Sequence, residues 1–289
     1  MKDIVYPMSA IVGQEAAKRA LLLALVNPRA GGLLLSGAQG TAKTLLVRAA
    51  GALPQVGKLT QLPLGATDDM VFGGTDIERL LADGVRTAQP GILRRAAGGL
   101  LLLDEANLLP RPFLHAALAA AEEDASVVLV GTMNPEEGDI RPQLLDRFAL
   151  SVTVAGEREA ETRVEVIRRR IAYERDPDAF AEMYAAEQKH LRTQILEARA
   201  RVPGVTVPDA VLDYAAQISL TLGVDGHRAD ITLIKAGIAH AALAGRSAVT
   251  AEDLQRVSRL VLAHRMRRRP FEEGAVDWTA VDAILGESA

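Results

Sequence analysis

Cysteine is absent from the 289-residue chain, which excludes disulfides, thiolate metal sites and thiol nucleophiles and fits a reducing cytoplasm. Aromatic residues make up only 3% of it, too few for the stacking platforms that bind single-stranded nucleic acid. The formal net charge of -4 provides no positive field for nucleic acid or an anionic membrane. No apolar run approaches the roughly 18–20 residues of a membrane helix, and the N-terminus lacks the apolar core of a signal peptide. We therefore expect a cytoplasmic protein that binds no nucleic acid and inserts into no membrane.

The chain does have the composition of a globular protein, with 49% hydrophobic and 24% charged residues. In its first half, short Leu/Val-rich runs alternate with helical patterns, which predicts a parallel sheet buried on both faces. The expected strands are Gly32–Ser36, Leu59–Leu64, Leu100–Asp104, Val127–Thr132 and Leu150–Val154. The helices expected between them are Gln14–Val26, Lys43–Leu53, Arg111–Ala121 and Pro142–Phe148.

The second half of the chain shows helical patterns only, and several begin with a helix start signal such as Pro208 or the Thr250/Asp253 pair. The expected helices are Glu157–Ala172, Asp178–Arg201, Pro208–Leu222, Arg228–Ala244, Ala251–Arg267 and Trp278–Leu285. We therefore predict an α/β domain over residues 1–155, followed by an all-helical domain over residues 156–289.

A glycine-rich segment, residues 37–44 (GAQGTAKT), follows the first expected strand and opens an expected helix. A P-loop requires this context, because backbone N–H groups and a helix N-terminus together cradle phosphates. Lys43 would reach the outer phosphates of ATP, and the hydroxyl of Thr44 would ligate Mg²⁺. The alternative is a plain strand-to-helix turn with a surface lysine. The candidate phosphate-binding residues are Gly37, Ala38, Gln39, Gly40, Thr41, Ala42, Lys43 and Thr44.

One residue of this segment departs from the usual P-loop pattern. Ala42 occupies the position where the second glycine is normally found. A methyl group is tolerated there if the residue has helical backbone angles, because only a positive φ demands glycine.

The second chemical signal is an apolar run that ends in two carboxylates, residues 100–105 (LLLLDE). At the end of a buried strand, Asp104 would hold the Mg²⁺ shell, and Glu105 would polarise the water that attacks the γ-phosphate. The alternative is that the pair only caps the next helix. Together with the P-loop, the acidic strand end predicts ATP hydrolysis.

Three later residues complete a possible hydrolysis site. Asn134 follows a buried strand, where its amide could orient the attacking water, although Asn-Pro is also a common turn. Arg147 ends a short helix and could reach a neighbouring subunit's γ-phosphate as an arginine finger, or form a surface pair with Asp146. Arg228 opens a helix of the second half and could reach the nucleotide across the domain cleft, or serve only as a helix-start residue.

These motifs, in this order, resemble the layout of the AAA+ ATPases, an α/β fold whose parallel sheet is flanked by helices and followed by a helical lid. Longer stretches are similar to the magnesium chelatase I subunit, and the resemblance spans nearly the whole chain. They are residues 6–15 (YPMSAIVGQE), 62–69 (LPLGATDD), 107–110 (NLLP), 131–148 (GTMNPEEGDIRPQLLDRF) and 262–270 (LAHRMRRRP).

The resemblance implies a homo-oligomeric ring of six subunits with ATP, accompanied by Mg²⁺, bound between neighbours. It also implies a role for each motif. Gly37, Gly40, Lys43 and Thr44 would bind phosphate and metal, Asp104 and Glu105 would be the Walker B pair, Asn134 sensor 1, Arg147 the finger and Arg228 sensor 2. Residues 73–93 would form an insertion in helix 2, and the turn at residues 11–14 would lie beside the adenine.

The family pairs this motor with a D subunit that contains a von Willebrand A domain and with a large porphyrin-binding H subunit. Together they insert Mg²⁺ into protoporphyrin IX for (bacterio)chlorophyll synthesis. The resemblance thus implies an ATPase that serves a magnesium chelatase. The choice of Mg²⁺ and of protoporphyrin IX depends on this family resemblance alone.

Several features favour an alternative, a MoxR-like AAA+ chaperone that acts with a von Willebrand A partner on another metalloenzyme. Ala42 is one, and the short connection at residues 53–62 is another. Residues 121–127 also leave no room for the β-hairpin that usually precedes the sensor 1 strand. A ring scaffold without activity and a DNA motor are further alternatives.

Residues 265–269 (RMRRR) form the only dense basic run, which we interpret as a solvated helix end; the alternative is contact with an acidic neighbour or a nucleotide. The five histidines show no spacing suited to a metal site, so we expect most of them at the surface or in the lid.

Overall fold

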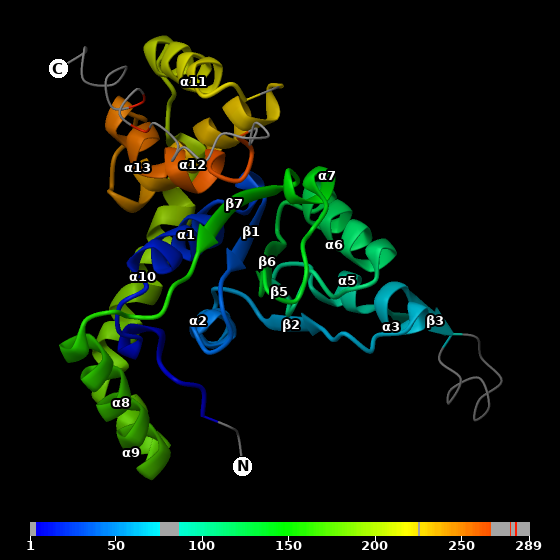
Figure 1. The fold of residues 1–289 in the computed structure, drawn as a ribbon, viewed down its shortest axis with the longest axis vertical. Helices are drawn as coiled ribbons and strands as arrows, with labels where there is room; N and C mark the ends of the chain where they lie inside the picture. Colours follow the sequence, from blue (N-terminus) through cyan, green and yellow to red (C-terminus); the bar gives the residue numbers. More distant parts are fainter. Residues whose placement is uncertain (1–3, 76–86, 225, 267–277, 279–280, 282–289) are drawn as a thin grey trace.

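The computed structural model of the protein describes residues 4–75, 87–224, 226–266, 278 and 281 (Figure 1). Its centre is a parallel sheet of five strands in the order β2-β5-β6-β1-β7. The strands are β1 (Gly32–Ser36), β2 (Leu59–Leu62), β5 (Leu100–Leu103), β6 (Val128–Met133) and β7 (Phe148–Thr153). All five coincide with predicted strands to within a few residues, so the expected parallel sheet is confirmed.

The four leucines of β5 show why these apolar runs form buried strands. Successive side chains of a strand point to opposite faces of the sheet. Leu100 and Leu102 accordingly join the core on one face, and Leu101 and Leu103 join the core on the other. All four are at most 1% exposed, because helices cover both faces.

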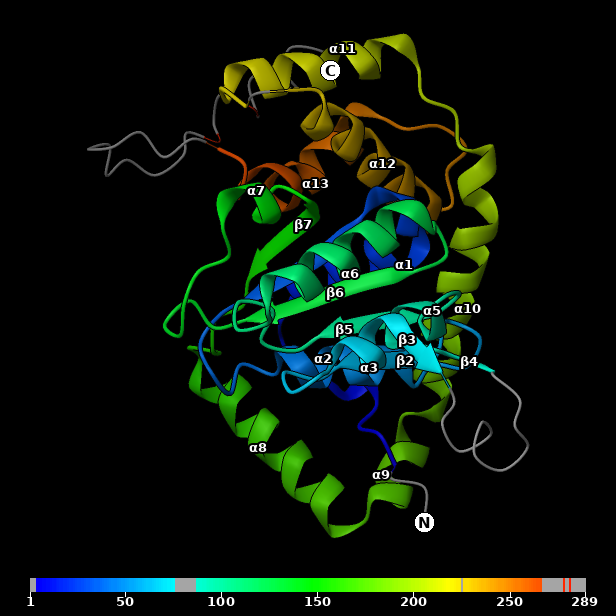
Figure 2. The ribbon, with the colours of Figure 1, turned by 90° about the vertical axis from the view of Figure 1, so that its right-hand side faces the viewer.

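The helices of the first half lie on both sides of the sheet (Figure 2). They are α1 (Glu15–Val26), α2 (Lys43–Gly51), α3 (Asp68–Phe72), α5 (Ile92–Arg95), α6 (Arg111–Glu123) and α7 (Pro142–Leu145), with the short turns η1 (Met8–Ala10) and η2 (Pro28–Ala30). Helices α1 and α2 bury apolar residues in the core that contains Leu100, whereas α6 buries Phe113 and Leu114 in the opposite core.

Every element of the described chain after β7 is helical. These elements are α8 (Ala160–Arg175), α9 (Pro177–Met183), α10 (Ala185–Arg201), η3 (Val202–Gly204), α11 (Asp209–Thr221), α12 (Arg228–Leu243) and α13 (Ala251–Leu262). Helix α10 runs alongside α1, from the α8–α9 end of the molecule to the end where α11, α12 and α13 lie (Figures 1 and 2). The domain boundary near residue 156 stays a prediction.

A buried carboxylate organises the α12–α13 part. Thr250 and Asp253 form a capping box at the start of α13, as their spacing predicts. Burial opposes ionisation of Asp253, yet hydrogen bonds from His240, Arg246 and Thr250 hold its pKa well below its usual range. Asp253 is therefore a fully buried but well-paired anion that ties α12 to α13.

Two expected elements are wrong in detail. The single helix expected over Asp178–Arg201 is broken at Tyr184, whose ring lies 5.0 Å from that of Phe180 in an aromatic cluster. The helix expected over Pro142–Phe148 ends at Leu145, because Phe148 is fully buried as the first residue of β7. Most of the helix expected at Trp278–Leu285, of which residues 278 and 281 are described, and the end of the one expected to reach Arg267 lie outside the described residues.

Two connections between secondary-structure elements correspond to family features discussed above, the insertion in helix 2 and the β-hairpin before the sensor 1 strand. Strands β3 (Gly73–Thr75) and β4 (Ala88–Pro90), which the sequence did not predict, pair antiparallel within the suggested helix 2 insertion, whose residues 76–86 lie outside the described chain. A tight turn closed by hydrogen bonds from Ser126 to Asp124 joins α6 to β6, so no hairpin intervenes there. None of the described helices is long and apolar enough to span a bilayer.

Candidate nucleotide-binding site

The P-loop connects β1 to α2, and its geometry excludes a side chain at one glycine and strains a side chain at another. A Cβ on Gly37 would lie 2.1 Å from the carbonyl oxygen of Val154, and Gly40 has a φ of +79°. The N–H of Gly37 donates to the carbonyl of Met133 at 3.1 Å, which fixes the loop to the end of β6. The backbone therefore adopts the compact loop that the sequence predicted.

Ala42 does not have the helical backbone that would make its methyl group free of cost. Its φ is 63° and its ψ is 17°, in the left-handed region. Residues other than glycine cost roughly 1 kcal/mol or more in this region, because Cβ approaches the following carbonyl. From the sequence we expected a methyl group to be tolerated at this position only if the residue had helical backbone angles, and Ala42 does not have them. The loop therefore carries local strain at the position where a P-loop usually has glycine.

Lys43 folds back over the loop. Its Nζ donates to the carbonyl oxygens of Gly37 at 2.6 Å and Ala38 at 2.7 Å. Burial lowers the pKa of Lys43. Nearby carboxylates, first among them that of Asp104, oppose this shift by raising the pKa. The ammonium is therefore held where phosphate oxygens would replace the two carbonyls as its partners.

A chain of hydrogen bonds joins the P-loop to the acidic strand end. The hydroxyl of Thr44 donates to Oδ1 of Asp104 at 2.8 Å, and the hydroxyl of Thr132 donates to the same oxygen at 2.7 Å. Hydroxyl and carboxylate oxygens are ligands that Mg²⁺ accepts, and it takes its remaining ligands from phosphates and water. Thr44 and Asp104 thus suit a metal that arrives with a nucleotide. Among the described residues, no group of three or more His, Asp or Glu side chains is placed to hold a metal ion.

Glu105 has an unusual backbone. Its φ is 54°, and its N–H donates to the hydroxyl of Thr132 at 3.1 Å. The same hydroxyl therefore accepts from the backbone of Glu105 and donates to the carboxylate of Asp104. It thereby links the two adjacent acidic residues. Thr132 is only 2% exposed, so water cannot easily take its place.

The side chain of Asn134 is held at both ends. Its Oδ1 accepts from the N–H of Glu136 at 3.2 Å, and its Nδ2 donates to Oε1 of Glu137 at 2.9 Å. The side chain of Asn107 donates to the carbonyls of Asn134 at 3.2 Å and Gly138 at 3.1 Å and thereby holds the loop that these two residues bound. Glu137 thereby contributes a third carboxylate near Lys43, besides Asp104 and Glu105.

These side chains line one pocket with a cavity volume of about 290 Å³. Its lining comprises Gln39–Leu45, Asp104, Glu105, Thr132–Asn134 and Glu137. Apart from Gly37 and Ala38, which are not in this lining, the predicted phosphate, metal and water-orienting residues are thus brought together at the carboxyl ends of β1, β5 and β6. Neither Arg147 nor Arg228 is among them.

The N-terminal turn approaches this region from the side of β7. The backbone N–H of Gln14 donates to Glu157 at 3.2 Å, and its side chain donates to the carbonyl of Ala155 at 2.7 Å. Residues 155–157 directly follow Val154, whose carbonyl touches Gly37 of the P-loop. The turn at residues 11–14 thus lies near the loop, and its role beside an adenine stays a prediction.

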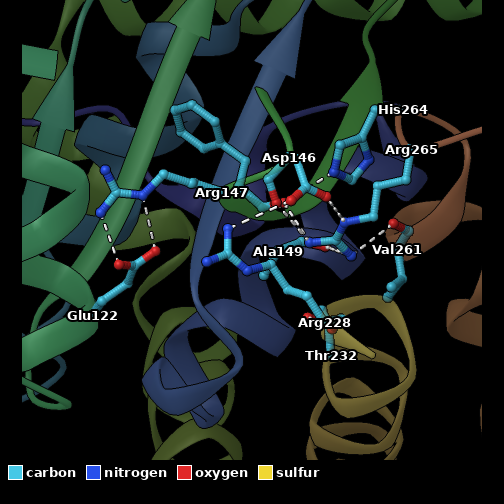
Figure 3. A network of polar contacts seen from close by, with 10 residues as sticks. Glu122, Asp146, Arg147, Ala149, Arg228, Thr232, Val261, His264 and Arg265 are labelled. Atoms are coloured by element: carbon cyan, nitrogen blue, oxygen red, sulfur yellow. Dashed lines mark hydrogen bonds and ion pairs between the residues drawn. The ribbon is translucent and has the colours of Figure 1, made fainter. Parts of the chain in front are cut away.

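The two remaining predicted arginines lie together elsewhere. Arg147 makes a two-pronged ion pair with Glu122 at the end of α6, with N···O distances of 3.0 and 2.7 Å. Arg228, at the start of α12, reaches Oδ2 of Asp146 at 3.4 Å (Figure 3). The hydrogen bond from Arg147 lowers the pKa of Glu122.

Both arginines line a second pocket, with a cavity volume of about 590 Å³. We call it the arginine face. Its charged lining residues are Arg29, Arg147, Arg228, Lys235, Arg265 and a single acid, Glu122. Arg228 therefore does not line the phosphate pocket of its own chain, and its role as a sensor stays a prediction.

Comparison with known proteins identifies the family. Residues 32–124 match the AAA domain of the dynein-related subfamily, and residues 212–285 match the AAA lid domain. The 38 kDa magnesium-chelatase subunit of Rhodobacter capsulatus is 42% identical, over 93% of this chain and 90% of its own length. The chain belongs to the magnesium-chelatase I-subunit family. The predicted family, the AAA+ fold and the ATPase class are confirmed with it.

Other members of the family extend this result. A magnesium-chelatase subunit ChlI homolog from Methanocaldococcus jannaschii is 36% identical over 98% of this chain and 91% of its own length. An uncharacterized protein from Mycobacterium tuberculosis is 43% identical over 97% of this chain, which spans only 48% of that protein's length. I-subunit-like chains therefore occur both alone and within longer proteins.

Two solved structures resemble this I-subunit homologue. A chain in a model of the complex between subunits BchI and BchD of magnesium chelatase, based on a cryo-EM reconstruction, is 41% identical with a TM-score of 0.50. The alignment covers 92% of this chain and 97% of that one. A crystal structure from Cytophaga hutchinsonii is 20% identical with a TM-score of 0.71, over 98% and 92% of the two chains, and shows the shared fold alone.

In this I-subunit homologue, one sequence interpretation is wrong. Arg265 does not belong to a solvated helix end, because its side chain is only 2% exposed and bonds to Asp146; Arg267–Arg269 lie outside the described residues. Three residues of the phosphate pocket region were missed: Asn107, Thr132 and Glu137. All three stand inside motifs that the family resemblance quoted, but only the fold reveals the partners of Thr132.

Proposed function

We propose that this chain is the ATP-hydrolysing motor subunit of a metal chelatase and powers insertion of Mg²⁺ into protoporphyrin IX in (bacterio)chlorophyll synthesis. The observation that carries the proposal is the 42% identity with the Rhodobacter capsulatus subunit, over a chain whose phosphate pocket is lined by Lys43, Thr44, Asp104, Glu105 and Asn134. The absence of cysteine suits work in a reducing cytoplasm.

The phosphate pocket would bind the triphosphate of ATP. Backbone N–H groups of the P-loop and the N-terminus of α2 would face the phosphates, and Lys43 would exchange its two carbonyl partners for phosphate oxygens. Thr44 and Asp104 would hold the Mg²⁺ that accompanies ATP, and this ion would neutralise charge on the phosphates.

Hydrolysis requires a water in line with the γ-phosphate. The carboxylate of Glu105 would accept the proton of that water, and the amide of Asn134 would orient it. An amide has two N–H donors and two acceptor lone pairs, so Asn134 can orient the water while it keeps its bonds to Glu136 and Glu137.

The arginine face would complete the site of the next subunit. The lining of the phosphate pocket offers a single cation, Lys43, for the charge of a triphosphate. The arginine face carries five cations and one acid on another part of the same molecule. A head-to-tail ring brings these two surfaces together, with Arg147 as the finger and Arg228 as a second contact. We propose six subunits, as in the family.

The metal and the porphyrin would be held by partners. The described residues contain no cluster suited to hold the inserted metal. We therefore propose a D-type subunit with a von Willebrand A domain as the direct partner and a large H-type subunit as the porphyrin-binding component. Hydrolysis would drive a conformational change that passes from the ring to these subunits.

A pull-down from native extract tests this proposal, with the tagged chain, Mg²⁺ and a slowly hydrolysed ATP analogue. We expect a von Willebrand A subunit together with a very large porphyrin-binding subunit, and Mg-protoporphyrin fluorescence when the purified set receives ATP. Lys43→Ala should abolish the fluorescence, whereas Lys58→Ala, an exposed lysine, should not.

The second candidate is a MoxR-like chaperone, favoured by the tight α6–β6 turn and by Ala42. Recovery of a von Willebrand A protein with an unrelated metalloenzyme, and without a large chelatase subunit, would replace the chelatase proposal with this one. The ATPase activity would stand in either case.

A further inference from the structure

The chain that leaves α13 makes a dense set of contacts with the turn that carries Arg147. The guanidinium of Arg265 is buried there, with its side chain only 2% exposed. Its Nη2 donates to the carbonyl of Asp146 at 3.1 Å and to that of Phe148 at 2.9 Å (Figure 3). These carbonyls belong to the residues on either side of Arg147.

Further bonds fix the guanidinium in place. Its Nε donates to Oδ1 of Asp146 at 3.2 Å, and its Nη1 donates to the carbonyl of Val261 at 3.0 Å, on the last turn of α13. The guanidinium therefore bridges the end of α13 and the turn between α7 and β7. A planar fork with five donors suits this task, and a lysine ammonium does not.

His264 adds a second clamp to the same turn. Its Nε2 is 2.9 Å from the carbonyl of Phe148. Burial, together with the charge of Arg265, lowers the pKa of His264 to about 4, so the ring is neutral at pH 7. A neutral ring beside a carbonyl must carry its proton on Nε2, and His264 therefore donates to the oxygen that also accepts from Arg265.

The packing of α13 does not by itself require a buried cation. Val257, Val261 and Leu262 are fully buried and already anchor this helix in the core that includes β7. Burial of a guanidinium is costly unless its donors are satisfied. Here one donor reaches Val261 on α13 and the others reach residues close to Arg147 in the chain, while Arg228 reaches the other carboxylate oxygen of Asp146.

We propose that Arg265 is a positioning residue that holds the backbone on both sides of Arg147, so that the finger is presented to the neighbouring subunit only when α13 is docked. The inference rests on the proposed role of Arg147 in the neighbour's site. It assigns the lid a direct mechanical link to catalysis in the next subunit, through the α7–β7 turn rather than through the bound nucleotide.

Steady-state kinetics give the first test. Arg265→Gln and Arg265→Lys should each lower kcat for ATP about 10²-fold, as expected for a misplaced catalytic group, with KM and nucleotide affinity unchanged within twofold. Arg256→Gln, on the exposed side of α13, is the matched control and should keep the wild-type kcat. A loss of nucleotide affinity as large as the loss of kcat would overturn the proposal.

ATP hydrolysis by mixed rings distinguishes a positioning role of Arg265 from a purely structural one. Lys43→Ala subunits cannot hydrolyse ATP but keep an intact finger, whereas Arg265→Gln subunits keep an intact phosphate pocket. Mixing the two inactive variants should restore hydrolysis to at least tenfold above either alone, because some Arg265→Gln pockets then face an intact finger. No recovery would overturn the proposal, provided that the control mixture described next recovers.

The control mixture separates this inference from the function on which it rests. Arg147→Ala mixed with Lys43→Ala should recover in the same way. If neither mixture recovers, the role of Arg147 in the neighbour's site fails, and the inference fails with it. If Arg265→Gln does not fold, as judged by thermal unfolding, Asp146→Asn replaces it, because this half-exposed carboxylate bonds directly to Arg265. We expect a smaller loss of kcat for Asp146→Asn, about tenfold, with the same recovery.

Discussion

The phosphate pocket and the arginine face are built in opposite ways. The pocket gathers residues from the carboxyl ends of three neighbouring strands, and its phosphate-binding part is one continuous loop. The arginine face draws on η2, α6, the α7–β7 turn, α12 and the end of α13. The first depends on local sequence, and the second depends on the lid being folded onto the sheet.

Their charges differ as well. The pocket offers Lys43 together with three carboxylates, whereas the arginine face offers five cations and one carboxylate. A pocket of the first kind can bind Mg²⁺ and ATP but has little to stabilise the charge that develops during hydrolysis. The difference supports our proposal that one chain carries two halves of a site rather than one complete site.

The largest effect should come from removing the carboxylate of the phosphate pocket that activates water. Glu105→Gln should lower kcat for ATP by about 10²–10³-fold, because an amide cannot accept the proton of the attacking water. Binding of a fluorescent ATP analogue should be unchanged. Glu123→Gln, at the exposed end of α6, is the matched control. A variant Glu105→Gln that hydrolyses ATP at the wild-type rate would remove Glu105 from the mechanism.

The next effect concerns stability and arises from His264, which shares the carbonyl of Phe148 with Arg265 of the arginine face. Because burial holds the pKa of His264 at about 4, below 6.5, the folded state binds fewer protons than the unfolded state between these pH values. His264 thus stabilises the fold fully above pH 6.5, and this contribution of about 3 kcal/mol is lost as the pH falls toward 4.

Denaturant unfolding at several pH values measures this loss. Between pH 6.5 and 4.5, where carboxylates contribute least, His264→Gln should show a much flatter pH dependence than the wild type. His190→Gln, at an exposed position on α10, should keep the wild-type slope. Equal slopes for all three proteins would contradict a buried, neutral His264.

A smaller effect is expected within the phosphate pocket from Thr132→Val. The substitution keeps the shape of the side chain but removes the hydroxyl shared by Asp104 and the backbone of Glu105. A buried N–H left without a partner costs about 1–3 kcal/mol in the free energy of unfolding. We also expect about a tenfold loss of ATPase activity. Thr132→Ser, which keeps the hydroxyl, should restore both, and failure to do so would point to packing instead.

The smallest effect concerns strain in the P-loop. Ala42→Gly relieves a left-handed φ of 63° but loosens the unfolded chain, so the free energy of unfolding should rise by about 0.5 kcal/mol. The same change at Ala172, in a helical and exposed part of α8, should lower it by up to about 1 kcal/mol. Destabilisation by Ala42→Gly would show that the loop is unstrained.

The comparison also shows which features the sequence can predict. The five strands and the P-loop were predictable because apolar runs and glycine spacing are local signals. The break at Tyr184 and the β3–β4 pair were not, because an aromatic cluster and a glycine-rich pairing of distant segments determine them. Ala42 was recognised as a departure, but its backbone angle required the structure.

Two residues that sequence reasoning missed or misread, Thr132 and Arg265, have partners far away in the chain. The hydroxyl of Thr132 acts on a carboxylate 28 positions earlier in the chain, and Arg265 acts on a turn 119 positions earlier. In the sequence, Arg265 opens a basic run, which usually indicates a solvated surface. Only the docking of α13 against β7 turns this arginine inward.

The central claim, that neighbouring subunits complete each other's site, is tested most directly by mixing two inactive variants. Lys43→Ala lacks the pocket function and Arg147→Ala lacks the finger, so each alone should hydrolyse ATP at least 10²-fold more slowly than the wild type. Mixed in equal amounts, they should recover a substantial fraction of wild-type hydrolysis, because some interfaces then join an intact pocket to an intact finger. Mixtures no more active than their components would contradict the shared site.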